Sequence, residues 1–238
     1  MTAVLDVAHV SLLFGGIKAL DDVSLAVEQA HLVAVVGPNG AGKTSLLNCI
    51  TGAYRASSGR ISFQGAEITH APAHTAAKRG IARTFQHNEL FPQLNTLENL
   101  LLGRHAALSY DLISAGLFLK GCRGWELEQR EKVEAVIEFF ELEAYRKHAV
   151  GDLPYGVQKI IGLARAFAAE PALVLLDEPS AGLNRQEKED LARYLLANAP
   201  RVCSDYRLDR ARYAARPRPR GSGFRAALRQ ETRGWIDP

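Results

Sequence analysis

The sequence predicts an α/β fold, and three observations carry that prediction. Residues 32–36 read Leu-Val-Ala-Val-Val, an apolar and β-branched run typical of a buried strand. A glycine-rich loop follows it, and residues 45–50 then show the apolar spacing of a helix. A second apolar strand, Leu173–Leu176, ends directly in the carboxylates Asp177 and Glu178. Strands that alternate with helices in this way indicate a largely parallel sheet whose carboxyl edge carries the ligand.

The glycine-rich loop has the residue pattern G-x-x-x-x-G-K-[ST] of a phosphate-binding loop. It consists of nine consecutive residues: Gly37, Pro38, Asn39, Gly40, Ala41, Gly42, Lys43, Thr44 and Ser45. Glycines let backbone N–H groups approach a phosphate chain, and the positive end of the following helix faces the same anion. Lys43 adds a charge for the β- and γ-phosphates, and the Thr44 hydroxyl can bind Mg²⁺. A chance glycine-rich turn would lack this flanking strand and helix.

The composition predicts one domain, or one domain with a subdomain, with a sizeable apolar core. The chain has 238 residues, of which 47% are hydrophobic. No apolar run approaches the about 20 residues of a membrane helix, and the N-terminus lacks the pattern of a signal peptide. Three scattered cysteines are typical of reduced thiols in a cytosolic protein, and they predict neither a disulfide framework nor a zinc site.

The net charge of +3 is unevenly distributed along the chain. Residues 201–238 contain ten arginines and four acidic residues, which gives +6, so residues 1–200 carry −3. The basic balance therefore belongs to the tail and does not indicate that the body binds nucleic acid.

The N-terminal part predicts short strands around two candidate ligand residues. Strands are expected at Val4–Val10, Val23–Val27, Ser58–Phe63 and Gly80–Phe85. Phe14 lies between the first two strands, where its ring either stacks on adenine or packs in the core. Gln86 directly follows the last strand. A lone glutamine is usually a surface residue, but next to a phosphate loop it can hold Mg²⁺ or a water.

The middle of the chain predicts a helical subdomain at residues 93–149, inserted into an α/β core formed by residues 1–92 and 150–200. Glu126–Phe140 has helical spacing, whereas residues 108–124 resemble a loop and have no clear assignment. Further helices are expected at Lys159–Ala169 and Arg185–Ala197.

Asp177 and Glu178 are the candidate acids of the site. Side chains at the carboxyl end of a parallel strand face the ligand, so Asp177 can hold the Mg²⁺ shell and Glu178 can polarise the attacking water. A solvated acid pair at a strand end is common, but the upstream phosphate loop favours the catalytic interpretation.

Taken together, residues 4–200 resemble the ATP-binding subunit of ABC transporters. This resemblance implies a P-loop NTPase fold with N-terminal antiparallel β-strands and an inserted helical subdomain, and an ATPase that uses ATP and Mg²⁺. Phe14 matches the adenine-stacking aromatic, residues 37–45 the Walker A loop and Gln86 the Q-loop. Residues 173–178 match the Walker B strand with its catalytic glutamate, and residues 180–184 match the D-loop. By this resemblance, Gln86 and Glu178 are catalytic, and Thr44, Gln86 and Asp177 hold the metal.

The signature motif, usually L-S-G-G-Q, appears as Leu153, Pro154, Tyr155, Gly156 and Val157. In the family this motif contacts the γ-phosphate bound by the opposite subunit, which implies a homo- or heterodimer. Pro154 lacks the usual serine hydroxyl, and Val157 lacks the usual polar side chain. The variant looks like the Tyr-Gly form of subunits that import branched-chain amino acids, as do residues 83–86, 90–92 and 98–100. The resemblance does not separate these substrates from urea or other amides.

The resemblance also implies partners and a location. A membrane permease would dock on residues 86–103, and a periplasmic or extracellular substrate-binding protein would act indirectly. The subunit would sit peripherally on the cytoplasmic face of the inner membrane. An ABC-type ATPase acting on DNA is disfavoured, because the 57-residue insertion shows neither heptads nor a cysteine cluster. No nucleic-acid partner is therefore expected.

The tail after residue 200 departs from the family pattern. There the family has an apolar strand ending in a switch histidine, but this chain has no histidine after His148. The tail is either a disordered basic extension or the product of a reading-frame slip between Pro200 and Ser204. Codons compatible with residues 204–216, read one base later, can give P-T-I-V-L-I-E-H-D-M-R-L-V, which restores that strand and histidine.

Later parts of the tail support the same slip hypothesis. Shifted codons for residues 218–224 can give G-L-A-D-R-V-F, and those for residues 228–235 can give F-G-R-K-L-A-D-G; both match the family's continuation in order. On this hypothesis the C-terminal strands are missing or scrambled. We expect little regular packing over residues 201–238, uncovered apolar surface on the last helices, and weak or no ATPase activity. A catalytically impaired remnant of such a subunit is the alternative function.

Overall fold

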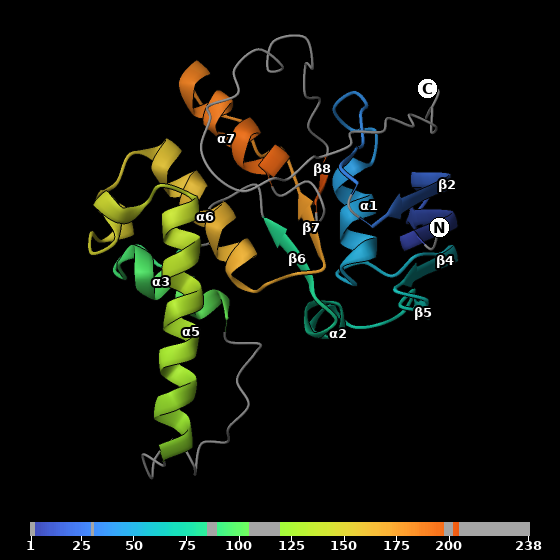
Figure 1. Cartoon of the computed structure of the whole chain (residues 1–238). Helices are drawn as coiled ribbons and strands as arrows, with labels where there is room; N and C mark the ends of the chain where they lie inside the picture. Colours follow the sequence, from blue (N-terminus) through green and yellow to red (C-terminus); the bar gives the residue numbers. More distant parts are fainter. Residues whose placement is uncertain (1–2, 30, 85–89, 105–119, 198–201, 205–238) are drawn as a thin grey trace.

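The computed structural model describes residues 3–29, 31–84, 90–104, 120–197 and 202–204. Within these residues the strands form two four-stranded sheets, one antiparallel and one parallel. Helix α1 (Lys43–Ile50) lies between the sheets, and the helices α3 (Thr96–Gly103), α5 (Lys120–Phe139) and α6 (Tyr155–Ala168) gather on the far side of the parallel sheet (Figure 1). The predicted α/β class with N-terminal antiparallel strands is confirmed.

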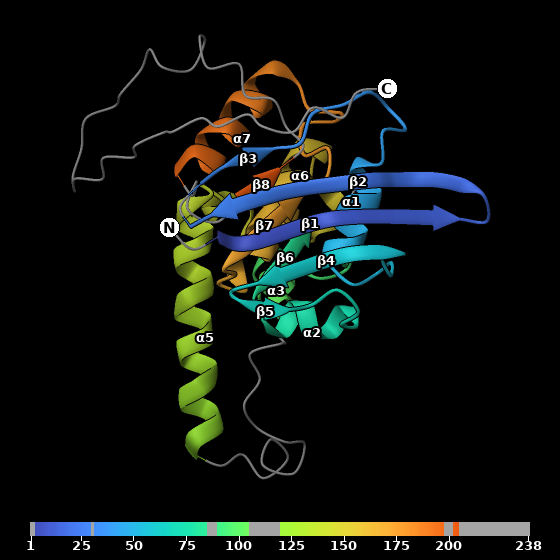
Figure 2. The same cartoon turned by 90° about the vertical axis from the view of Figure 1, so that its right-hand side faces the viewer.

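The antiparallel sheet has the strand order β2-β1-β4-β5 (Figure 2). Its strands are β1 (Ala3–Phe14), β2 (Ile17–Glu28), β4 (Ser58–Phe63) and the short β5 (Ala66–Glu67), which leads to helix α2 (Ala73–Lys78). Apolar side chains on one face of β1 and β4 are buried because they pack on α1: Leu5, Val7, Val10, Ile61 and Phe63. β1 is longer than the sequence predicted and ends at Phe14.

The parallel sheet has the order β3-β8-β7-β6, formed by β3 (Val33–Ala34), β8 (Val202–Ser204), β7 (Leu173–Leu176) and β6 (Ile81–Thr84). All four residues of β7 are buried, as predicted. The prediction for residues 32–36 is wrong in extent, because only two residues form β3 and Val36 is 58% exposed. Within the described part of the chain β3 pairs only with β8, so a second neighbour does not cover it.

β8 corrects the expectation that the chain packs irregularly from residue 201 onward. Residues 202–204 form parallel ladders with both β3 and β7. The short Val-Cys-Ser run suits such an inner position, because it has no proline and no charge. The remainder of the tail, residues 205–238, lies outside the described residues, so its predicted lack of packing stays a prediction.

Two helices begin earlier than the sequence indicated. α6 starts at Tyr155, because the carbonyl of Pro154 already accepts the first helical hydrogen bond from Gln158 N (3.0 Å). Proline is tolerated there since the first turn needs no N–H partner. α5 starts at Lys120, inside a stretch that resembled a loop, and ends at Phe139. α7 spans Arg185–Ala197, as predicted.

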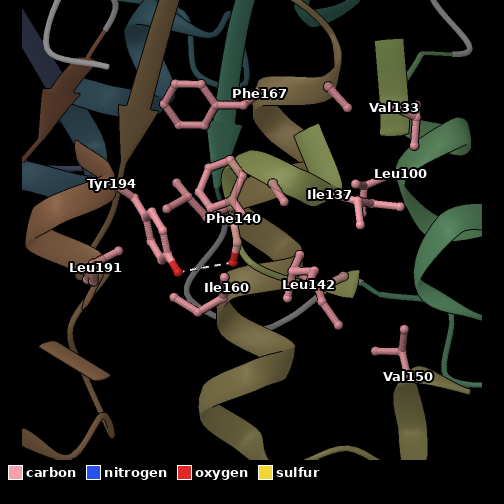
Figure 3. Packing of buried hydrophobic residues seen from close by; sticks show 14 of the residues in the cluster. Leu100, Val133, Ile137, Phe140, Leu142, Val150, Ile160, Phe167, Leu191 and Tyr194 are labelled. Atoms are coloured by element: carbon pink, nitrogen blue, oxygen red, sulfur yellow. Dashed lines mark hydrogen bonds between the residues drawn. The ribbon is translucent and has the colours of Figure 1, made fainter. Parts of the chain in front are cut away.

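The buried core consists of two clusters that meet at β7. Leu173 and Leu175 join the cluster around α1, whereas Val174 and Leu176 join the cluster around α5, α6 and α7. Figure 3 shows the second cluster, in which the Tyr194 hydroxyl donates to the Phe140 carbonyl (3.0 Å). The apolar side of α7 is therefore covered: Leu191, Tyr194 and Leu195 are buried, and the expected uncovered surface is not found there.

Among the described residues, none of the helices has the length and apolar character needed to cross a membrane.

Candidate functional site

The phosphate loop depends on two glycines with left-handed backbones. Gly40 has φ 86° and Gly42 has φ 84°, values that strain other residues. A Cβ on Gly42 would lie 2.3 Å from the carbonyl oxygen of Ala19 on β2, so only glycine fits between the loop and this strand. Gly42 caps α1, whose first turn carries no acidic residue to offset its positive end. The loop and helix together form a cradle suited to an anion.

The Lys43 side chain reaches back across the loop. Its Nζ donates to the carbonyl oxygens of Gly37 (2.9 Å) and Pro38 (3.0 Å). The ammonium group therefore lies over the backbone that begins the loop, where it can also reach a phosphate chain that follows the loop N–H groups.

Thr44 and Asp177 meet although 133 residues separate them in the sequence. The Thr44 hydroxyl donates to Asp177 Oδ1 at 3.2 Å, and Asp177 is only 3% exposed. The contact places the carboxyl end of β7 against the first turn of α1. A hydroxyl and a carboxylate oxygen are ligands that Mg²⁺ prefers, so these residues fit the ion that the sequence predicts.

Two further residues extend this contact, and the sequence alone gave neither a role. Arg83, in β6, donates through Nη2 to Asp177 Oδ2 at 3.0 Å and through Nη1 to Asn48 Oδ1. Asn48 lies four residues after Thr44, so both project from the same face of α1. The i, i+4 spacing places Asn48 on the face of α1 that carries Thr44, but the contact with Arg83 in β6 (Ile81–Thr84) depends on how the strands and α1 pack, so no local sequence signal indicates it.

Glu178 follows Asp177 and lies at the surface with a left-handed backbone, φ 46°. Such a conformation costs a non-glycine residue on the order of 1–3 kcal/mol and is frequent at functional sites. Lys159 Nζ donates to the Glu178 carbonyl at 3.4 Å. Desolvation by burial lowers the pKa of Lys159, partly opposed by the nearby Glu178 carboxylate. The two acids therefore lie together, with one buried and the other open to solvent.

The start of α6 contacts the segment that follows Glu178. A Cβ on Gly182 would lie 2.8 Å from the Tyr155 ring, and a Cβ on Gly156 would lie 1.9 Å from a carboxylate oxygen of Glu187. Glu187 accepts from the backbone of Asn184 (2.8 Å), an arrangement that the Asn-x-x-Glu spacing could have indicated. Pro154 and Tyr155 are exposed, whereas Val157 packs partly against the helical cluster.

Phe14 lies at the end of β1 and is 46% exposed, so it is not a core residue. Its ring meets Tyr54 edge to face, with centroids 5.2 Å apart. Tyr54, which the sequence analysis did not select, follows α1 and brings a second aromatic ring to this position. The predicted contact of Phe14 with adenine stays a prediction, and Gln86 lies outside the described residues.

A phosphate loop on an α/β sheet, with an acid pair at the neighbouring strand end, defines a P-loop nucleotide-binding protein. Comparison with known proteins gives the family: residues 20–181 match the ABC transporter family model. The chain belongs to the ABC transporter ATP-binding family and contains an ABC-type ATPase domain.

Individual relatives agree with this assignment. The chain is 39% identical over 189 residues to the high-affinity branched-chain amino acid transport ATP-binding protein BraF of Pseudomonas aeruginosa, covering 79% of this chain and 74% of the relative. It is similar to a solved ATP-binding cassette of an ABC transporter in its ADP conformation (TM-score 0.74, 30% identity, 88% and 83% covered). A dimeric cassette bound to ADP and phosphate shares the fold (TM-score 0.68, 24% identity, 84% and 86% covered).

Proposed function

We propose that this chain binds Mg²⁺-ATP between two ATP-binding subunits and that the site's chemistry is ATP hydrolysis. The observation that carries the proposal is the Thr44–Asp177 hydrogen bond, which joins the phosphate loop to the acid pair. Residues 37–45 would bind the phosphates, Phe14 the adenine, and residues 154–157 the γ-phosphate of the opposite subunit. Thr44, Gln86 and Asp177 would hold Mg²⁺, which neutralises phosphate charge when bound, and Glu178 and Gln86 would position the attacking water.

We further propose that the subunit energises import of branched-chain amino acids. BraF carries that transport in its name, and the Tyr155-Gly156 form of the signature resembles the same subgroup. The partners would be permease subunits, which dock on residues 86–103, and indirectly a substrate-binding protein. With such partners the chain would lie peripherally on the cytoplasmic face of the inner membrane. In this proposal residues 93–149 form the inserted helical subdomain, and residues 1–92 and 150–200 form the core.

Nucleotide binding can be tested by titrating a fluorescent ATP analogue into the chain, with Mg²⁺ and with EDTA. We expect binding that magnesium strengthens and that Lys43→Ala weakens at least tenfold, because Lys43 supplies the ammonium group at the loop. Lys147→Ala removes an equal charge from an exposed site and serves as the control. Magnesium-dependent binding that survives Lys43→Ala would contradict the proposal.

An impaired remnant is the second candidate, and the Arg-rich tail without a histidine supports it. We expect this chain to bind ATP but to hydrolyse it weakly or not at all, because the tail lacks the histidine expected at the γ-phosphate. The test compares steady-state turnover with a version whose reading frame is corrected between residues 200 and 204. Equal turnover would contradict this candidate, and sequencing the DNA there tests the slip itself.

A further inference from the structure

We propose that Arg83 is a positioning residue for the magnesium ion: it holds Asp177 Oδ2 and thereby presents Oδ1 to the metal beside Thr44. The inference rests on the proposed function, since it assumes that Mg²⁺-ATP binds at the phosphate loop. It concerns side chains on α1, on β6 and at the residue that directly follows β7.

The four side chains form one continuous chain of contacts. Thr44 donates to Asp177 Oδ1 (3.2 Å), Arg83 donates to Asp177 Oδ2 (3.0 Å), and Arg83 also donates to Asn48 Oδ1. Thr44 and Asn48 lie one turn apart on α1, so this helix supplies the first and the last side chain of the series of contacts. Parallel pairing of β6 with β7 sets Arg83 opposite Leu175, two residues before Asp177. Thr44, Asn48 and Arg83 are thus placed by regular secondary structure, and Asp177 by its position directly after β7.

Burial makes this ion pair different from one on the surface. The Arg83 side chain is 8% exposed and that of Asp177 is 2% exposed, so water can replace neither partner easily. A planar guanidinium donates in fixed directions, and Asn48 holds the second nitrogen of Arg83. Asn48 therefore fixes the direction from which the Arg83 guanidinium donates to Asp177 Oδ2.

The contact determines which carboxylate oxygen the metal can use. The terminal torsion of an aspartate is broad, so an unconstrained carboxylate samples many orientations. Arg83 occupies Oδ2, and Oδ1 faces the Thr44 hydroxyl, the other predicted metal ligand. Groups that hydrogen-bond to a metal-binding carboxylate tune the site in the same way, and their removal typically lowers metal affinity by about 10- to 100-fold.

The positive charge of Arg83 also repels a cation, which gives the opposite expectation. If repulsion dominated, removing Arg83 would strengthen magnesium binding. We infer that orientation dominates because Arg83 contacts the oxygen that does not face Thr44, and because its charge is already paired with Asp177. Repulsion and orientation predict opposite changes in magnesium affinity when Arg83 is replaced, so measuring that affinity in an Arg83 variant distinguishes them.

The experiment measures how magnesium strengthens binding of a fluorescent ATP analogue to the full chain, in wild type, Arg83→Met and Arg83→Lys. For Arg83→Met we expect the affinity for the ATP analogue in EDTA to stay within about twofold of wild type. The magnesium concentration that gives half of the maximal gain in affinity should rise at least about tenfold. Arg83→Lys keeps the charge but lacks the planar guanidinium, so its half-maximal magnesium concentration should lie between those of wild type and Arg83→Met. Arg79→Met, at the exposed end of α2, is the matched control and should behave as wild type.

Asn48→Leu provides a second route if Arg83→Met does not fold, because it removes a partner of Arg83 while keeping the ion pair. It should raise the half-maximal magnesium concentration by a smaller factor. An unchanged or lowered magnesium requirement in either folded variant would overturn the inference. If wild type bound the analogue equally in EDTA and in magnesium, the proposed function itself would fail instead.

Discussion

β3 and β7 lead into the two halves of the proposed nucleotide site, yet the two strands differ in length and burial. Both were predicted as buried strands from similar apolar runs. β7 lies between β6 and β8, and its four residues are all buried. β3 has two residues, pairs with β8 within the described part of the chain, and is followed by Val36 at 58% exposure. Neighbouring strands and helices, rather than composition, therefore decide how much of an apolar run is buried.

This difference between β3 and β7 suggests that one strand mainly stabilises the fold and the other mainly positions the binding loop. Apolar side chains of β7 belong to both core clusters, whereas the segment after β3 supplies the loop that we propose binds the nucleotide. Substitutions around β7 should therefore act on folding, and those around β3 should act on nucleotide affinity. The first prediction below tests this division directly, and two further predictions extend it to other buried contacts with smaller expected effects.

The largest effect is expected from Leu175→Ala, because this side chain is fully buried in the cluster around α1. The free energy of unfolding should fall by about 2–5 kcal/mol, measured by urea denaturation. Val36→Ala removes methyl groups from an exposed position and should change the free energy of unfolding by less than about 0.5 kcal/mol. Equal losses in the two variants would remove the distinction between the strands.

An intermediate effect is expected from Arg104→Met at the junction of α3, α5 and α6. Arg104 is buried and contacts Gln129, the carbonyl of Ala168 and the carboxylate of Glu170 (2.9 Å). Its loss should cost about 2 kcal/mol, since buried acceptors lose a charged donor.

The same contact predicts a pH dependence on the acid side. The hydrogen bond from Arg104 lowers the pKa of Glu170. The stabilisation is therefore present above the pKa of an unfolded glutamate and is lost as pH falls through the lower folded value. Urea denaturation between pH 7 and about pH 3 should show a smaller difference in the free energy of unfolding between wild type and Arg104→Met at acid pH, and the part due to Gln129 and the Ala168 carbonyl should remain. A constant difference would show that Glu170 contributes nothing to the effect.

The smallest effect is expected from Tyr194→Phe, which removes the hydrogen bond to the Phe140 carbonyl and should cost about 1 kcal/mol at neutral pH. Burial raises the pKa of Tyr194 to about 12. The stabilisation is therefore complete below the unfolded pKa of about 10 and is lost as pH rises toward 12. Denaturation at increasing alkaline pH should show the gap between the proteins narrowing, and a gap that widens would contradict the assignment.

The parts of the site that lie in one continuous segment could be predicted from the sequence. The loop of residues 37–45 and the acid pair at residues 177–178 are each encoded locally, by spacing and by an adjacent strand. Arg83 and Asn48 could not be assigned a role, because their contacts depend on how β6, β7 and α1 are placed relative to one another. The exposure of Val36 could not be predicted either, since it reflects what lies beside β3.

β8 makes the geometry of the proposed nucleotide site depend on residues that are synthesised after all of its predicted ligand residues. β3 and β7 are not direct neighbours in the sheet, and residues 202–204 bridge them. On the ribosome the glycine-rich loop and the acid pair can each emerge and take up local structure, but this ladder cannot hold them in register before residue 204 has left the exit tunnel. A nascent chain halted before Val202 would therefore contain every predicted ligand residue without the strand that sets their separation.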